Sequence, residues 1–229
     1  MRVGLRALLC WAILCGSMAW PAFAGAWLRD TGTKFFSYGA IVRKSGGFLR
    51  PEYSFYGEFG LSPYLTLGLD FNESQGPSGG HSGHALVFAR FPIARAWHKT
   101  KVAVEFGLGG NHYLGKWDGM IKSTLSIGRG FSSPWGAGWI NVDAALELRR
   151  PASRLAFKLD ATIGLSQGRR FRPMLQIEST YIVGKPLIWA VIPSVLIDGR
   201  NNQTWVIGIE RKTVGQPTLG VRFGLWRRF

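Results

Sequence analysis

The sequence predicts an all-β fold, an antiparallel transmembrane β-barrel of about twelve strands, with about ten as the alternative. The first reason is that the chain from Thr33 onward is a series of segments in which apolar residues alternate with polar or small ones, the period of a β-strand. The second is the pattern of an export signal in residues 1–24. The third is that no later run is apolar and long enough for a membrane-spanning helix, whereas alternating strands can cross a bilayer.

The predicted strands are roughly ten residues long, the length that a tilted strand needs to cross a bilayer. The clear segments are 65–72, 102–109, 140–149, 155–165 and 175–181, and the weaker ones are 33–42, 52–59, 85–91, 122–128, 187–197 and 204–210. The terminal stretch 219–229 completes the count of twelve. The count becomes ten if 33–42 or 187–197 does not span the membrane. Pro193 predicts a bulge or a strand end, because proline cannot donate to a ladder.

Clusters of Gly, Pro, Ser and Asn separate these segments and predict turns. They lie at 45–47, 62–63, 76–80, 132–134, 166–168 and 198–202. No inter-domain linker is evident, and the loops are too short for a folded plug or a large receptor surface. An even strand number would return both chain ends to one side of the membrane, which we expect to be the periplasmic side.

The N-terminal pattern is that of a secretory signal peptide. Arg2 and Arg6 precede the apolar run 7–19, and the small residues around Ala24 offer a cleavage site that would make Gly25 the mature N-terminus. A membrane anchor is the alternative, but the run is short for a membrane span. The predicted division is a signal peptide, 1–24, and one barrel domain, 25–229.

Both cysteines of the chain, Cys10 and Cys15, lie within the predicted signal peptide. The mature chain would therefore hold no disulfide. An exported protein without disulfides must be stabilised by a large core or by a closed, fully hydrogen-bonded barrel.

The chain is strongly basic, with 28 Lys and Arg against 13 Asp and Glu. Many basic residues fall in turns and at strand ends, where they would meet lipopolysaccharide phosphates on one side of an outer membrane and anionic phospholipid on the other. They are Arg43, Lys44, Arg50, Arg95, Lys99, Arg150, Arg154, Arg169, Arg170, Arg172, Lys185, Arg200, Lys212, Arg227 and Arg228. Nucleic acid is not an expected partner, because an export signal accompanies the charge and no binding motif does.

The polar face of the predicted strands is rich in small residues, which suits the interior of a modest barrel better than the surface of a soluble β-sandwich. The charged residues expected to line this lumen are Glu52, Glu58, Asp70, Glu105, Asp143, Glu147, Asp160, Glu178 and Glu210, with Lys101, Lys122, Arg149, Lys158 and Arg222. Carboxylates outnumber cations in this set, which would favour cations if a path exists. Interfacial girdles are expected from Tyr53, Phe59, Tyr64, Phe71, Trp139, Tyr181, Trp189, Trp205 and Phe229.

The chain ends in a strand pattern with an aromatic last residue. Apolar residues alternate over 219–225, and Phe223, Leu225 and Phe229 share one phase. This stretch resembles the terminal strand of the porin-like outer-membrane β-barrels of Gram-negative bacteria, which the barrel-assembly machinery recognises. Arg227 departs from that pattern, since the family usually has an apolar residue in its position. The resemblance implies an integral outer-membrane barrel.

Three functions remain open from the sequence. The first is a narrow passive channel for small solutes or a structural envelope protein. The second is a lipid-modifying hydrolase that uses His81, Ser82, His84 and His112, although these residues match no barrel-hydrolase motif. The three histidines could also bind a metal, but histidines in a Gly-rich loop are more often ordinary loop residues. The third is a soluble exported β protein. No catalytic, cofactor-binding or metal-binding residue is assigned, and no oligomeric state is predicted.

Overall fold

The computed structural model describes residues 25–45, 47–76, 79–94, 100–150, 154–167, 170–214 and 216–229. All twelve predicted strands are present, each extending beyond the stretch of clear alternation or shifted by a few residues. Their bounds are β1 Lys34–Ser45, β2 Phe48–Ser62, β3 Leu65–Gln75, β4 His81–Ala94, β5 Thr100–Tyr113, β6 Lys116–Ser133, β7 Gly136–Arg149, β8 Arg154–Leu165, β9 Phe171–Ile182, β10 Ile188–Asp198, β11 Gln203–Val214 and β12 Gln216–Arg228. The fold class is therefore all-β, as predicted, with twelve strands and not ten.

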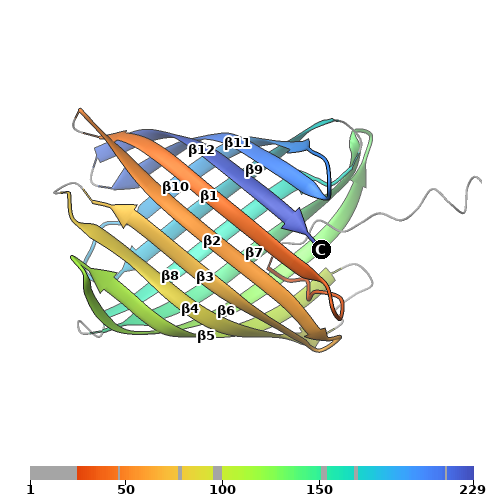
Figure 1. The fold of residues 1–229 in the computed structure, drawn as a ribbon, viewed down its shortest axis with the longest axis horizontal. Helices are drawn as coiled ribbons and strands as arrows, with labels where there is room; N and C mark the ends of the chain where they lie inside the picture. The colour runs from red at the N-terminus through yellow and green to blue at the C-terminus, as the bar shows by residue number, and fades with distance from the viewer. Residues whose placement is uncertain are drawn as a thin grey trace, which may run out of the picture.

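Each strand pairs antiparallel with its neighbours in sequence, and β1 pairs with β12 to close the barrel (Figure 1). At this seam Phe35 lies opposite Arg228 and Lys44 opposite Leu219. Lys34 and Phe229 exchange two backbone hydrogen bonds of 3.0 Å, so the last residue is tied to the first strand. Closure leaves no unpaired sheet edge, which satisfies the backbone without disulfides.

Pro193 produces neither of the two features expected of it. Strand β10 continues through this residue, and its pairing with β9 is unbroken. On the β11 side the pairs at Ile192 and Pro193 are missing, yet Val191 pairs with Arg211 and Ser194 with Gly208 in one unchanged register. The proline therefore removes ladder pairs locally without a bulge or a strand end.

The turn between β5 and β6 has one unusual residue, Leu114, beside the common turn residue Gly115. Leu114 has a φ of 53° and Gly115 a φ of 80°. Positive φ at two consecutive central residues is the conformation of a tight hairpin turn, and a residue with a branched side chain such as leucine rarely adopts it. In the predicted turn at 198–202, the residues with positive φ are Asn201 and Asn202, both at 57°. Asparagine adopts this conformation more readily than leucine does.

The outer face of the barrel is apolar and exposed over the middle of the strands. Val87, Phe106, Leu108, Ile121, Ile127, Leu159, Ile177, Ile207 and Phe223 are among its residues. A soluble protein does not expose a continuous apolar surface of this extent, so the outer face is one that lipid would cover. This face contradicts the soluble alternative. No helix in the described ranges is both long and apolar enough to span a membrane.

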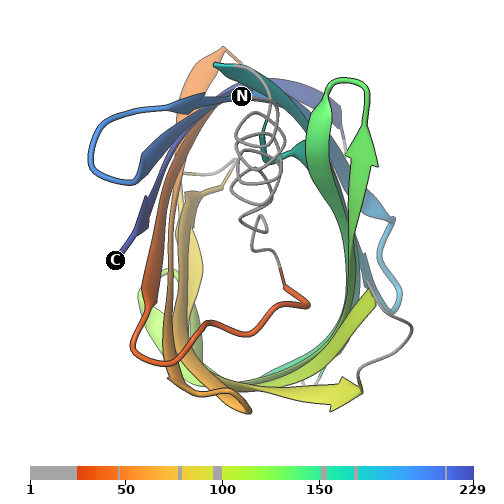
Figure 2. The ribbon, with the colours of Figure 1, turned by 90° about the vertical axis from the view of Figure 1, so that its right-hand side faces the viewer.

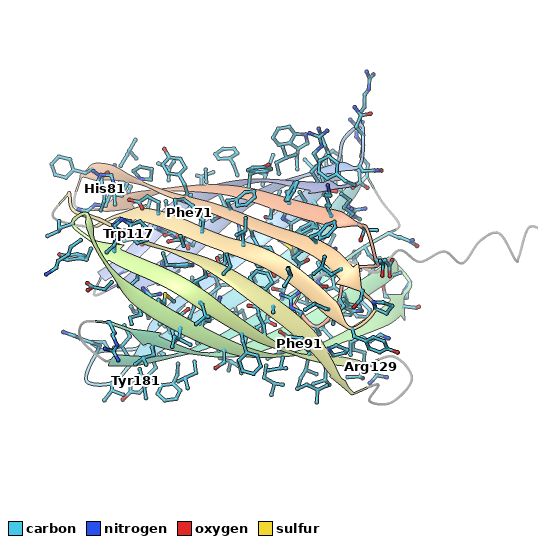
Figure 3. The ribbon with its side chains drawn as sticks, turned by 60° about the horizontal axis from the view of Figure 1, so that its bottom comes forward. Phe71, His81, Phe91, Trp117, Arg129 and Tyr181 are labelled. Carbon is cyan, nitrogen blue, oxygen red and sulfur yellow. The ribbon has the colours of Figure 1, made fainter. Side chains whose placement is uncertain are left out.

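Aromatic side chains also stand on the outer face toward both ends of the barrel. Figure 3 shows Trp117 near one end and Phe91 toward the other. Tyr53, Tyr64, Trp205 and Phe229 are exposed as a girdle requires. Trp139 is a wrong prediction: it is 2% exposed and faces the lumen. Its position one residue before the outward-facing Ile140 already determines that orientation.

Candidate functional site: the lumen

The charged residues predicted for the lumen lie together on the inner face of the sheet. Strand register places them on one side of the wall, opposite the exposed apolar residues. The ten principal candidates are Glu58, Asp70, Glu105, Lys122, Asp143, Glu147, Lys158, Asp160, Glu178 and Arg222. A cavity of about 240 Å³ lies among the lumen side chains. Seven of the ten line it, and Asp70, Glu147 and Glu178 complete the same face beside them.

One group of lumen residues, the Glu58 cluster, is fully neutralised. It consists of Arg29, Tyr56, Glu58, Arg90 and Glu105. Glu58 forms ion pairs with Arg29 and Arg90 and accepts a hydrogen bond of 2.7 Å from the Tyr56 hydroxyl. Arg90 reaches Glu105 at 2.6 Å and donates to the Tyr56 hydroxyl at 2.5 Å. Buried charges are tolerated when they are paired and hydrogen-bonded in this way.

A further ion pair joins two strands that are not neighbours in the sheet. Lys122 of β6 lies 2.8 Å from Asp70 of β3, so this pair crosses the inner surface above β4 and β5. His84 of the adjacent strand β4 lies 3.2 Å from the same carboxylate. These contacts narrow the lumen along β3 to β6.

A second set of ion pairs spans the seam between β1 and β12, where the barrel closes. Arg43 forms ion pairs with Glu52 of β2 at 2.5 Å and with Glu210 of β11, while Lys212 approaches Glu52 at 3.9 Å. Glu210 is 1% exposed. Because β11 and β2 are brought together only when the barrel closes, this cluster stabilises the closed form.

Carboxylates gather on the opposite part of the wall. Asp143 of β7 pairs in register with Asp160 of β8, and Asp160 with Glu178 of β9, so three carboxylates form a row across the inner face. We call Asp143, Asp160 and Glu178 the carboxylate row. Asp160 accepts a backbone hydrogen bond of 3.3 Å from Ser179, and within the described ranges it has no ion pair within 4 Å. Glu178 lies 4.0 Å from Arg222.

Two basic residues flank the carboxylate row without cancelling it. Lys158 approaches Glu147 at 3.6 Å, and Glu147 also binds Arg149 at 2.7 Å. Arg222 donates a 2.7 Å hydrogen bond to the side-chain oxygen of Gln176. Both basic groups line the cavity together with Asp143 and Asp160, so this part of the lumen is polar and suited to water.

The residues that precede β1 turn into the barrel. Figure 2 shows this segment, 25–33, crossing inside the ring of strands. Ala26 and Trp27 are buried against Trp139, Met174, Leu196 and Val206 of the inner wall. Arg29 is 4% exposed in the Glu58 cluster, where desolvation lowers the pKa of its guanidinium and Glu58 acts in the opposite direction. No loop plug was expected, and the chain instead occupies its own lumen with its N-terminal segment.

The predicted distribution of basic residues needs correction. Arg43, Arg172 and Lys212 lie near strand ends, as predicted, but their side chains bind or approach the carboxylates of Glu52, Glu210 and Asp198 and do not point toward the lipid phosphates. Arg29 and Arg90 also face inward and were not anticipated. The lumen as a whole therefore has no marked excess of carboxylates; the excess is local, at the carboxylate row. The predicted rim residues Arg95, Lys99 and Arg169 and the side chain of Arg154 lie outside what the structure describes.

Arg90 was detectable in principle. It shares the phase of Leu86 and Phe88, which face inward and are each 4% exposed. Apolar residues on the inner face made the phase of this segment ambiguous.

The histidines do not form one site. His81 and His112 lie on the outer face and contact the two oxygens of Glu73, at 3.1 Å and 2.6 Å, whereas His84 faces the lumen beside Asp70. The Ser82 hydroxyl pairs with that of Ser74, not with a histidine. Within the described ranges no group of three or more His, Cys, Asp or Glu could hold a metal. The arrangement required for a His and Ser hydrolase is therefore not found among these residues.

Comparison with known proteins supports the fold. No protein-family model matches the sequence, and no curated protein matches it. Among solved structures, a KdgM porin matches with a TM-score of 0.60 at 10% identity, over 85% of this chain and 99% of the porin. A KdgM porin in complex with disordered oligogalacturonate gives 0.56 at 9% identity, over 85% and 99%. The β domain of the Bordetella autotransporter Brka gives 0.53 at 12% identity, over 87% and 99%. The chain thus has the fold of a porin-like outer-membrane β-barrel.

Proposed function

We propose that the protein is a narrow passive channel for small solutes in the outer membrane, with a preference for cations. The cavity of about 240 Å³ inside the barrel, bordered by Asp143 and Asp160, is the observation that carries the proposal. An interior meant only as a structural core would be filled by apolar side chains or by fully paired charges. The carboxylate row has neither property.

The solute class follows from the charge beside the cavity. Rings or rows of carboxylates favour cations and small neutral solutes over anions. The oligogalacturonate of one structural neighbour is a polyanion, which the carboxylate row would repel; we therefore do not extend that ligand to this chain. A closed structural barrel is the second candidate, because segment 25–33 occupies part of the lumen.

Membrane placement follows the same proposal. Both chain ends would lie in the periplasm, and Phe223, Leu225 and Phe229 on the outer face of the closing strand would be the signal read by the barrel-assembly machinery. Phe223 is 53% exposed, as a residue read from outside the barrel must be. The remaining exposed basic residues, such as Lys185 and Arg200, would contact lipopolysaccharide or phospholipid phosphates.

Cysteine accessibility tests the channel directly, because the chain after residue 24 has no cysteine. Asp160→Cys would place a thiol in the lumen, and the matched control Leu159→Cys would place it one residue away against lipid. In planar bilayers, a cationic water-soluble thiol reagent should reduce the conductance of Asp160→Cys in steps and leave that of Leu159→Cys unchanged. Conductance that is absent from inserted, folded protein would contradict the channel and leave the structural barrel.

A further inference from the structure

The inner wall is shaped to receive the N-terminal segment. At Gly128 of β6, a Cβ atom would lie 2.3 Å from the ring of Trp27, and at Gly60 of β2 it would lie 2.2 Å from the carbonyl oxygen of Asp30. Either side chain would force the segment to move, since real Cβ atoms do not approach other atoms so closely. The wall thus has glycine at two positions against which the segment lies.

Polar contacts fix the segment at both of its ends. The Ala26 amide donates to the side-chain oxygen of Asn141 on β7 at 3.1 Å, and the Arg29 amide donates to the Thr66 hydroxyl on β3 at 2.9 Å. Gly32 donates to the Gly60 carbonyl at 2.8 Å. Because β3 and β7 lie far apart around the ring of strands, the segment spans the lumen from wall to wall (Figure 2).

The start of the segment rests on the carboxylate row. Gly25 has a φ of 35°, and a Cβ atom there would lie 2.2 Å from Oδ1 of Asp143. Covalent geometry therefore places the Gly25 nitrogen within about 5 Å of that oxygen. Asp143 Oδ2 accepts a hydrogen bond from Asn141 at 2.7 Å, while Oδ1 is buried and has no hydrogen-bond partner within the described ranges. A buried carboxylate oxygen without a donor is costly.

We propose that removal of the leader after Ala24 creates that donor: the new α-ammonium group of Gly25 forms an ion pair with Asp143 inside the lumen. Residues 25–33, held by this pair and by Arg29 with Glu58, then act as an internal plug that narrows the channel on the side of the barrel where β1 begins. The ion pair does not depend on the proposed function, whereas the narrowing rests on it.

The ion pair is tested by the reactivity of the amine. Protein purified from membranes of cells that express the full sequence is first examined by mass spectrometry for an N-terminus at Gly25. The rate of N-terminal acetylation is then compared in the wild type, Asp143→Asn and the control Glu178→Gln, which changes the same row away from Gly25. A charge-assisted hydrogen bond should slow the wild type and the control by about tenfold or more relative to Asp143→Asn. A different N-terminus, or equal rates in all three proteins, would overturn the ion pair.

The plug is tested by changing the wall and not the segment. Gly60→Ala places a Cβ atom against the backbone of the segment, whereas the control Gly119→Ala meets nothing within 4 Å. Single-channel conductance should rise in Gly60→Ala and stay at the wild-type value in Gly119→Ala. Equal conductance in both variants would overturn the plug. If no variant shows single-channel conductance while the Gly25 amine is still acetylated slowly, the channel and its narrowing are both overturned. The ion pair would stand in that case.

Discussion

The two sides of the lumen wall use the same kinds of residue with different results. In the Glu58 cluster on β2, β4 and β5, carboxylates alternate in space with Arg side chains, and the charges are buried and paired. On β7 to β9 the carboxylate row brings Asp143, Asp160 and Glu178 next to one another beside a cavity. Both sides border the same cavity, but pairing leaves the first side without net charge, whereas the second side presents carboxylates that are only partly compensated. The strand that carries each charge, more than the total charge, determines which part of the wall is paired and which part is not.

The largest effect should come from breaking the paired side. Glu58→Gln would leave Arg29 and Arg90, which are 4% and 3% exposed, without their shared carboxylate. We expect a loss of about 3–5 kcal/mol in the free energy of unfolding, the usual cost of an uncompensated buried charge. Urea unfolding in lipid vesicles, followed by tryptophan fluorescence, measures it. Asp160→Asn is the matched change on the other side of the lumen. It should lower the free energy of unfolding by about 0.5 kcal/mol or less, because it removes repulsion between carboxylates. Equal losses in both variants would contradict the distinction between the paired and the unpaired side.

The next largest effect is expected from placing arginine on the outer face of β8 rather than on its inner face. Leu159 is 54% exposed on the outer face of β8, and Asp160 follows it on the inner face. Leu159→Arg should lower the free energy of unfolding by about 2–4 kcal/mol, the cost of a cation facing the lipid near mid-bilayer. Asp160→Arg should be tolerated, since the new cation faces Asp143 and Glu178. The same unfolding assay compares them, and a larger loss in Asp160→Arg would mean that the faces are assigned the wrong way round.

The smallest effect concerns the turn between β5 and β6. Leu114 holds a positive φ that asparagine adopts more readily. Leu114→Asn should therefore raise the free energy of unfolding by about 1 kcal/mol or less. Leu187→Asn, in another exposed turn where φ is not positive, is the control and should give no gain. A gain of the same size in both would point to solubility and not to backbone strain.

Much of the fold could be predicted because a barrel repeats one local rule. Alternation alone identified all twelve strands, and phase assigned Asp143, Lys158 and Asp160 to the same face. Trp139 was misplaced because its position near a strand end was given more weight than its phase.

The remaining features depend on closure and could not be predicted locally. Arg43 meets Glu210 only because β1 pairs with β12, a contact 167 residues apart in sequence. Segment 25–33 has no periodicity, so nothing in its sequence indicates that Trp27 turns into the lumen. A sequence feature related to its position is the presence of glycines in the part of the wall that it contacts.

The most direct test of the central claim is the ion selectivity of the open channel. The reversal potential of single channels in a KCl gradient is measured for the wild type and for the double variant Asp160→Asn with Glu178→Gln, with Glu52→Gln as a lumen control away from the carboxylate row. We predict a cation-preferring wild type, a control that keeps that preference, and a cation-to-anion permeability ratio about twofold lower in the double variant. An anion-preferring wild type, or a ratio that the double variant leaves unchanged, would contradict the account.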